Sequence, residues 1–85
     1  MLTVTESAKE MLRTIDRPEN GVLRLEPVDE EKLGFTIGSA VPDDQVVEEG
    51  GNALLHVPAP VSEMLEGASL DRVDTPEGPR LALKR

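Results

Sequence analysis

The stretch VLRLEPVDEEKLGFTIG, residues 22–38, decides the fold because it holds two runs in which apolar residues alternate with others. In the first run, Leu23 and Leu25 alternate with polar residues, which is the pattern of a half-buried strand. Pro27 closes the run, and a proline has no backbone N–H to donate to a neighbouring strand. The first run therefore predicts a strand that ends at Pro27 or lies at the edge of a sheet.

The second run, LGFTIG, predicts another strand. Its apolar residues Leu33, Phe35 and Ile37 alternate with glycine and threonine, so we expect these three side chains to pack inward. The two runs are joined by the charged connection DEEK, residues 29–32.

A helix is predicted before this stretch. Thr5 is a suitable N-cap, because its hydroxyl can accept a hydrogen bond from the first helical turn. Ala8, Met11, Leu12 and Ile15 then recur at i, i+3, i+4 and i+7, which places them on one helix face.

The segments after residue 38 predict two hairpins separated by a second, short helix. QVVEE and ALLHVP flank a glycine-rich turn, and SLDRVDT and PRLALKR flank the turn PEG. Between the hairpins, Val61, Met64 and Leu65 form the apolar face of the short helix, with Pro60 in its first turn. The whole pattern predicts an α+β fold of mainly antiparallel strands, in one domain spanning residues 1–85.

The composition restricts the classes of partner and of chemistry. Seventeen acidic residues against nine basic ones give a net charge of -8, which argues against nucleic acid and membrane surfaces. This charge permits a protein partner with a basic face or a hard cation, and it also serves solubility. No apolar run approaches the roughly 20 residues needed to span a bilayer, and the N-terminus lacks the pattern of a signal peptide, so we expect a cytoplasmic protein. The absence of cysteine excludes thiolate zinc sites, cysteine nucleophiles and iron–sulfur ligation by the chain's own thiolates.

Several segments, taken in order, resemble the HesB-like family of A-type iron–sulfur carriers. These are LTVTESAKEML, GVLRLEP, LGFTIG, DDQVVEEGGNALLHVP and LEGASLDRV. The likeness covers nearly the whole chain, and the order and spacing of the segments carry it. The resemblance implies a small HesB-like fold and a relation to iron–sulfur cluster assembly.

The departures from the family pattern concern its cluster ligands. Matching Gly34-Phe35 to the family's "G-[MF]" pair puts Lys32 at the position of the first family cysteine. The family's Cys-x-Cys pair lies beyond the last strand, whereas this sequence ends at Lys84-Arg85. The resemblance therefore implies a divergent, cysteine-free member that binds no cofactor and acts as a non-catalytic binding or accessory module.

An alternative interpretation is a carboxylate-based metal-binding protein, with iron as the metal. Its candidate ligands are Glu30, Glu31, Asp43, Asp44 and His56. Against it, adjacent side chains of an extended segment diverge, so the loop acids are also expected as solvated charges. The acidic pairs Asp43-Asp44 and Glu48-Glu49 are expected to protect a strand edge rather than to form a docking patch for a basic protein, which is the alternative.

His56 is the single histidine, and it alternates with Leu55 and Val57, so we expect it on the less buried face of its strand. A third interpretation, a small acid–base enzyme, requires two carboxylates, or His56 and a carboxylate, facing one pocket. We assign no catalytic residue from the sequence. A homodimer is left open, because the core of an 85-residue chain is marginal.

Overall fold

The computed structural model describes residues 1–15, 19–28 and 33–84. The elements along the chain are β1 (Thr3–Val4), α1 (Glu6–Arg13), β2 (Val22–Pro27), β3 (Leu33–Gly38), β4 (Gln45–Glu49), β5 (Asn52–Val57), α2 (Ala59–Met64), β6 (Ser69–Thr75) and β7 (Gly78–Lys84). The predicted α+β class, with an N-terminal helix and a second short helix, is confirmed.

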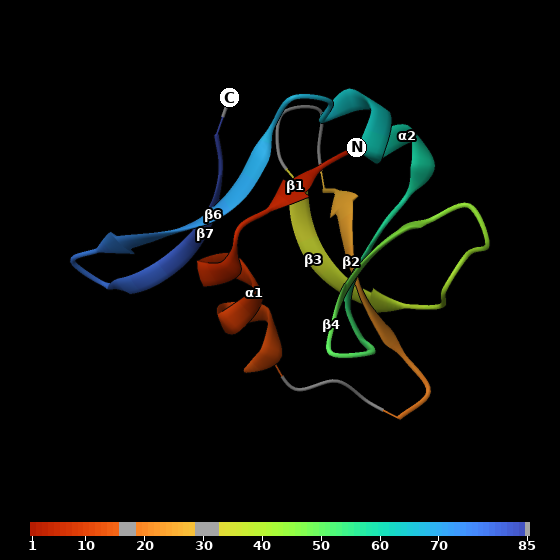
Figure 1. Cartoon of the computed structure of the whole chain (residues 1–85), viewed down its shortest axis with the longest axis horizontal. Helices are drawn as coiled ribbons and strands as arrows, with labels where there is room; N and C mark the ends of the chain where they lie inside the picture. Colours follow the sequence, from red (N-terminus) through yellow and green to blue (C-terminus); the bar gives the residue numbers. More distant parts are fainter. Residues whose placement is uncertain (16–18, 29–32, 85) are drawn as a thin grey trace.

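The strands form two sheets, shown in Figure 1. The larger has the order β3-β2-β5-β4 and the smaller the order β1-β6-β7. The two predicted hairpins, β4–β5 and β6–β7, are antiparallel, and β2 and β3 form a third antiparallel pair. β2 also pairs with β5, and β1 with β6, in parallel. These two parallel pairings were not predicted, because they join segments that are distant in the sequence.

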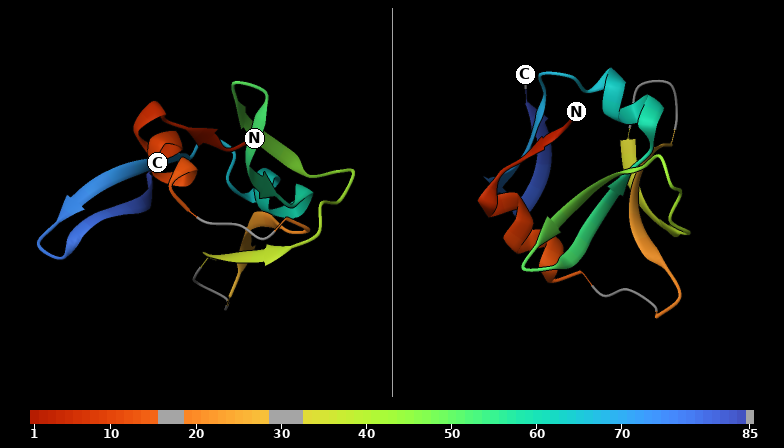
Figure 2. Two further views of the ribbon diagram at one scale, coloured as in Figure 1. Left: turned by 90° about the horizontal axis from the view of Figure 1, so that it is seen from below. Right: turned by 45° about the vertical axis from the view of Figure 1, so that its right-hand side comes forward.

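The connection from β3 to β4 positions the candidate site. Because β3 and β4 form opposite edges of the larger sheet, residues 39–44 must cross over β2 and β5 to reach the far edge. This connection is called the crossover loop below. Figure 2 shows it passing across the sheet, well away from the β6–β7 hairpin, which extends from the rest of the molecule.

Helix α1 begins as predicted and packs between the two sheets. The hydroxyl of Thr5 accepts a hydrogen bond from Ala8 N at 3.2 Å and donates one to Asp71 Oδ1 at 2.6 Å, which fastens the helix N-terminus to β6. Ala8 and Leu12 are completely buried on the face that contacts β5 and β6. Ile15 lies beyond the end of α1 and still packs against the core.

The core draws on both sheets and both helices. Its buried apolar residues are Leu2, Ala8, Leu12, Leu23, Leu25, Val47, Leu54, Leu55, Val57, Val61, Leu65, Ala68 and Leu70. The prediction for α2 holds for Val61 and Leu65, but it is wrong for Met64, whose side chain is mostly exposed. Met64 is the last residue of this short helix, and the chain turns away there before Gly67, whose φ is 79°.

The inward packing predicted for β3 is correct for only one of three side chains. Leu33 packs against the core, but Phe35 and Ile37 remain 39% and 47% exposed. The predicted face is right, because Phe35 and Ile37 lie opposite the buried Leu25 and Leu23 of β2. Their burial is incomplete because β3 is an edge strand, and alternation does not distinguish an edge from the centre of a sheet.

None of the described helices is long and apolar enough to cross a membrane.

Candidate functional site

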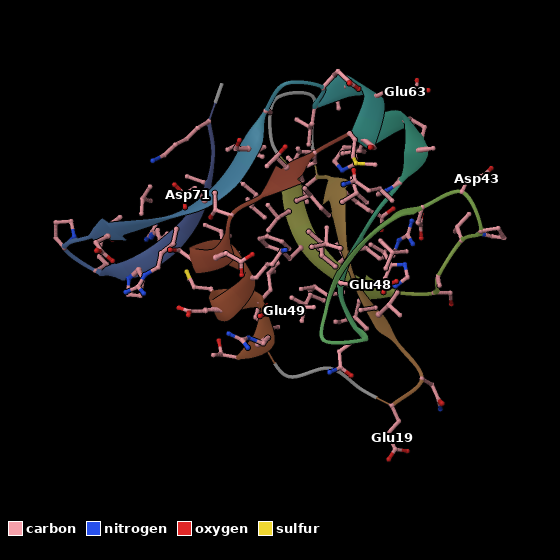
Figure 3. The ribbon with its side chains drawn as sticks, viewed as in Figure 1. Glu19, Asp43, Glu48, Glu49, Glu63 and Asp71 are labelled. Atoms are coloured by element: carbon pink, nitrogen blue, oxygen red, sulfur yellow. The ribbon has the colours of Figure 1, made fainter. Side chains whose placement is uncertain are left out.

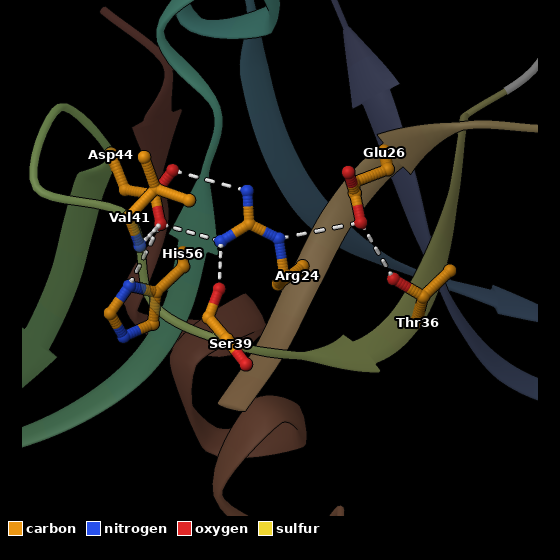
Figure 4. A network of polar contacts seen from close by, with 7 residues as sticks. All are labelled: Arg24, Glu26, Thr36, Ser39, Val41, Asp44 and His56. Carbon is orange, nitrogen blue, oxygen red and sulfur yellow. Dashed lines mark hydrogen bonds and ion pairs between the residues drawn. The ribbon is translucent and has the colours of Figure 1, made fainter. Parts of the chain in front are cut away.

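A cluster of charged side chains lies on the face of the larger sheet opposite the apolar core. Arg24 of β2 and His56 of β5 are neighbours in the parallel pairing of these two central strands. The cluster comprises Arg24, Glu26, Thr36, Asp44 and His56 and is called the polar cluster below (Figure 4). Arg24 and His56 are both more than 90% buried, which is unusual for charged and polar residues and requires specific partners.

Arg24 fastens the crossover loop to the sheet. Its Nη1 atom donates to the carbonyl oxygen of Ser39 at 2.9 Å and to Asp44 Oδ2 at 2.6 Å, and its Nη2 atom donates to Asp44 Oδ1 at 3.2 Å. These contacts hold both ends of the loop, because Ser39 follows β3 and Asp44 precedes β4. Paired charge-assisted hydrogen bonds of this kind are the strongest in proteins and fix the geometry of both groups.

Glu26 and Thr36 complete the contacts of the guanidinium group. Glu26 Oε2 lies 3.3 Å from Arg24 Nε and accepts a hydrogen bond from the Thr36 hydroxyl at 3.0 Å. The two acids on opposite sides of Arg24 raise its pKa, Asp44 through its hydrogen bonds first and Glu26 less strongly. Arg24 therefore stays charged while it is buried.

Asp44 is the centre of the cluster. Its side chain is only 1% exposed and also accepts a hydrogen bond from Val41 N at 2.8 Å. The hydrogen bonds from Arg24 lower the pKa of Asp44 below its ordinary value of 3.8, and the Val41 N–H lowers it further, while desolvation opposes both. The carboxylate is thus ionised and surrounded by donors.

His56 approaches Asp44 without a well-directed hydrogen bond. Its Nδ1 atom lies 3.4 Å from Asp44 Oδ2, within ion-pair distance, yet it has no hydrogen-bond partner in the described part of the chain. The prediction that His56 faces away from Leu55 and Val57 is correct. The prediction that this face is less buried is wrong, because the crossover loop covers it.

The acids of Asp43-Asp44 and Glu48-Glu49 do not gather into one docking patch, which was the alternative to a protected strand edge. Asp44 is buried in the polar cluster, and Glu49 pairs with Arg13 of α1 at 3.4 Å, which leaves Asp43 and Glu48 exposed at separate places (Figure 3). The two adjacent carboxylates of each pair point in different directions, one toward a cation and one toward solvent. Glu48 and Glu49 lie on the edge strand β4, where the strand-edge alternative placed acidic residues.

The predicted metal ligands are brought together only in part. Of the five candidates, the structure joins Asp44 and His56, with Arg24 beside them, while Glu30, Glu31 and the neighbouring Lys32 lie outside the described residues. Within the described ranges, no group of three His, Asp or Glu side chains is placed to hold a metal ion. The guanidinium of Arg24 also donates to the carboxylate oxygens of Asp44, which a metal cation would need as ligands.

Sequence reasoning did not identify a second polar contact, made by Gln45. Its side-chain amide donates to Leu2 O at 2.7 Å and accepts from Leu2 N at 2.9 Å and from the Ser62 hydroxyl at 2.6 Å. Gln45 therefore joins the N-terminal segment, β4 and α2. No local pattern around Gln45 signals this role, because its partners are more than ten residues away.

Two solved structures are similar to this one over nearly its whole length. SufA of Escherichia coli, which is involved in the biosynthesis of iron–sulfur clusters, matches 99% of this chain and 84% of its own with a TM-score of 0.67 and 22% identity. A crystal structure of IscA with a [2Fe-2S] cluster matches 100% of this chain and 85% of its own, with a TM-score of 0.60 and 18% identity. The chain has the SufA and IscA fold.

The sequence itself gives no such match. No protein-family model fits the chain, and no curated protein matches it. At 22% and 18% identity, the two structures establish the architecture, and they leave the chemistry to be argued from the residues of this chain.

Proposed function

We propose that this chain is a non-catalytic binding or accessory module, related to the iron–sulfur assembly proteins that share its fold, and that it holds no cluster of its own. The observation that carries the proposal is the SufA and IscA architecture built without a single cysteine. Iron–sulfur clusters are held mainly by thiolates, which donate strongly to iron. Lys32, at the position that the resemblance assigns to a cysteine, offers no lone pair while it is protonated.

The polar cluster supports a structural role for its acid and its histidine. A general acid or base must reach the proton that it transfers. The side chains of Asp44 and His56 are 1% and 10% exposed, and Asp44 already accepts three hydrogen bonds, two from Arg24 and one from Val41. Asp44 therefore serves to hold the crossover loop through Arg24, and His56 lies buried beside it.

The charge of the chain favours a basic protein partner. At a net charge of -8, the whole chain attracts cationic surfaces, and exposed acids such as Asp43, Glu48 and Glu63 are spread over the loops, the larger sheet and α2 (Figure 3). Such a field increases the rate of encounter more than it increases affinity.

Anaerobic reconstitution with iron and sulfide tests the absence of a cluster. We expect the desalted chain to show no visible charge-transfer absorption and no bound acid-labile sulfide, with IscA treated in parallel as the positive control. Stoichiometric iron and sulfide on this chain would overturn the proposal. A Lys32→Cys variant, compared with Lys32→Ser, shows whether a restored thiolate is enough to recruit iron.

A further inference from the structure

Strand β3 is an edge strand without the usual protection. It pairs only with β2 within the larger sheet, and its six residues include no charged residue and no proline. Phe35 and Ile37 extend the apolar row of Leu25 and Leu23 from the core to the sheet edge, where they stay 39% and 47% exposed. An uncovered apolar edge is a template for an additional strand.

The opposite edge of the same sheet is protected. β4 carries Glu48 and Glu49 and a register shift between Val47 and Glu48, both of which disfavour the addition of a strand. Val46 of β4 is 39% exposed, as Phe35 is, so the two edges differ in charge and regularity more than in apolar exposure. The contrast singles out β3 as the edge that is open to a partner.

The charges near β3 indicate which occupant suits it. The only basic residue of β2 and β3 is Arg24, and it is buried and bonded to acids. Glu26, opposite Gly34 in the β2–β3 pairing, has a side chain that is 40% exposed, and Glu19 is exposed shortly before β2 begins. A second copy of this chain would bring another -8 charge to the edge, whereas a basic segment is attracted to it.

We propose that the β3 edge binds an extended segment of a partner protein that alternates apolar residues and is flanked by lysine or arginine. The segment adds as a further strand of the larger sheet, so that backbone hydrogen bonds provide affinity and its apolar side chains cover Phe35 and Ile37. This inference rests on the proposed function as a binding module and names its surface and the chemistry of its partner.

A synthetic peptide tests the proposal directly. The probe is a fluorescent peptide whose centre alternates valine and threonine and which carries two lysines at each end. It is titrated with the whole chain, and binding is followed by fluorescence anisotropy. We expect saturable binding that weakens by about tenfold or more when Phe35→Thr and Ile37→Thr are combined, and that weakens as salt screens the charges. Val46→Thr is the matched control, and it should leave the affinity unchanged.

Several outcomes would overturn the proposal. These are the absence of binding at about 1 mM peptide, equal binding of a peptide with glutamates in place of the lysines, and equal losses in the Phe35/Ile37 and Val46 variants. Amide exchange provides a readout on the unmodified chain, because the peptide should protect β3 amides and leave those of β4 unchanged. Protection at β4 instead would contradict the assignment even if the double variant failed to fold.

Light scattering identifies the competing occupant. A dimer of the free chain that Phe35→Thr with Ile37→Thr converts to a monomer would show that a second copy covers β3, and it would replace this proposal. The test is independent of the cluster assay. If the peptide does not bind and no cluster can be reconstituted, only the inference about β3 is removed. If a stable cluster is reconstituted, the proposed function is removed, whatever the result of the peptide titration.

Discussion

The two faces of the larger sheet are both buried around β2, but different interactions bury them. On one face, Leu23 and Leu25 pack into the apolar core, where burial requires only shape and volume. On the other face, Arg24 is buried only because Asp44, Glu26 and the Ser39 carbonyl satisfy its donors. The apolar face should tolerate similar residues, whereas the polar face depends on each partner being present.

The largest loss of stability is expected on the apolar face. Leu55 of β5 is completely buried in the core, so Leu55→Ala leaves a cavity there. We expect a decrease of about 3 to 4 kcal/mol in the free energy of unfolding, measured by urea denaturation. A loss below about 1 kcal/mol would mean that the core collapses around the smaller side chain.

The second largest effect is expected on the polar face. Asp44→Asn keeps the shape but removes the charge that neutralises Arg24, so we expect a loss of about 3 kcal/mol, at the lower end for a broken buried ion pair because Glu26 remains. The crossover loop should also open, which proteolysis within residues 39–44 would detect.

The adjacent acid is the matched control for Asp44. Asp43 is exposed in the same loop, so Asp43→Asn should change the free energy of unfolding by less than about 0.5 kcal/mol. Equal effects of the two substitutions would show that Asp44 acts only through the net charge of the chain.

The sequence predicted the elements of both faces but not their relation. The alternation in β2 and β5 correctly separated Leu23, Leu25, Leu55 and Val57 from Arg24 and His56. It could not show that a loop covers the second face, because the parallel β2–β5 pairing and the crossover loop join distant segments. Asp44 and His56 were candidates from the sequence, but the pairing of Asp44 with Arg24 was not predicted.

The exposure of Phe35 and Ile37 was missed for the related reason that strand order was unknown. An alternating run has the same appearance at the edge of a sheet as at its centre.

The pH dependence of unfolding separates the two faces further. Because Arg24 lowers the pKa of Asp44 below 3.8, the unfolded chain binds this proton more readily than the folded chain. The contribution of Asp44 to the free energy of unfolding is fully present above its ordinary pKa. It is lost as the pH falls through the lower pKa that Asp44 has in the folded chain.

The free energy of unfolding in urea should therefore decrease less between about pH 5 and about pH 2.5 for Asp44→Asn than for the wild-type chain. Asp71, whose pKa is lowered by the Thr5 hydroxyl, titrates in both proteins and cancels in the difference. Equal losses would show that Asp44 titrates normally in the folded chain.

A smaller effect than that of Asp44→Asn tests how firmly the polar face is held. A Cβ atom at Gly38 would lie 3.0 Å from Cδ of Arg24, and a Cβ at Gly34 would lie 2.8 Å from Cγ1 of Val28. Val28 is exposed and can turn aside, whereas Arg24 is fixed by Asp44. We expect Gly38→Ala to lower the free energy of unfolding by about 1 kcal/mol and Gly34→Ala to be nearly neutral.

The ion pair between Arg24 and Asp44 should determine how much stability Gly38→Ala removes. If Asp44 prevents Arg24 from moving, then Gly38→Ala should cost less in the Asp44→Asn background, and a double-mutant cycle in urea measures that coupling. Additive effects would show that the stem of Arg24 is held by packing against β3. The polar face would then resist the extra methyl group in the same way as the apolar one, through shape and volume.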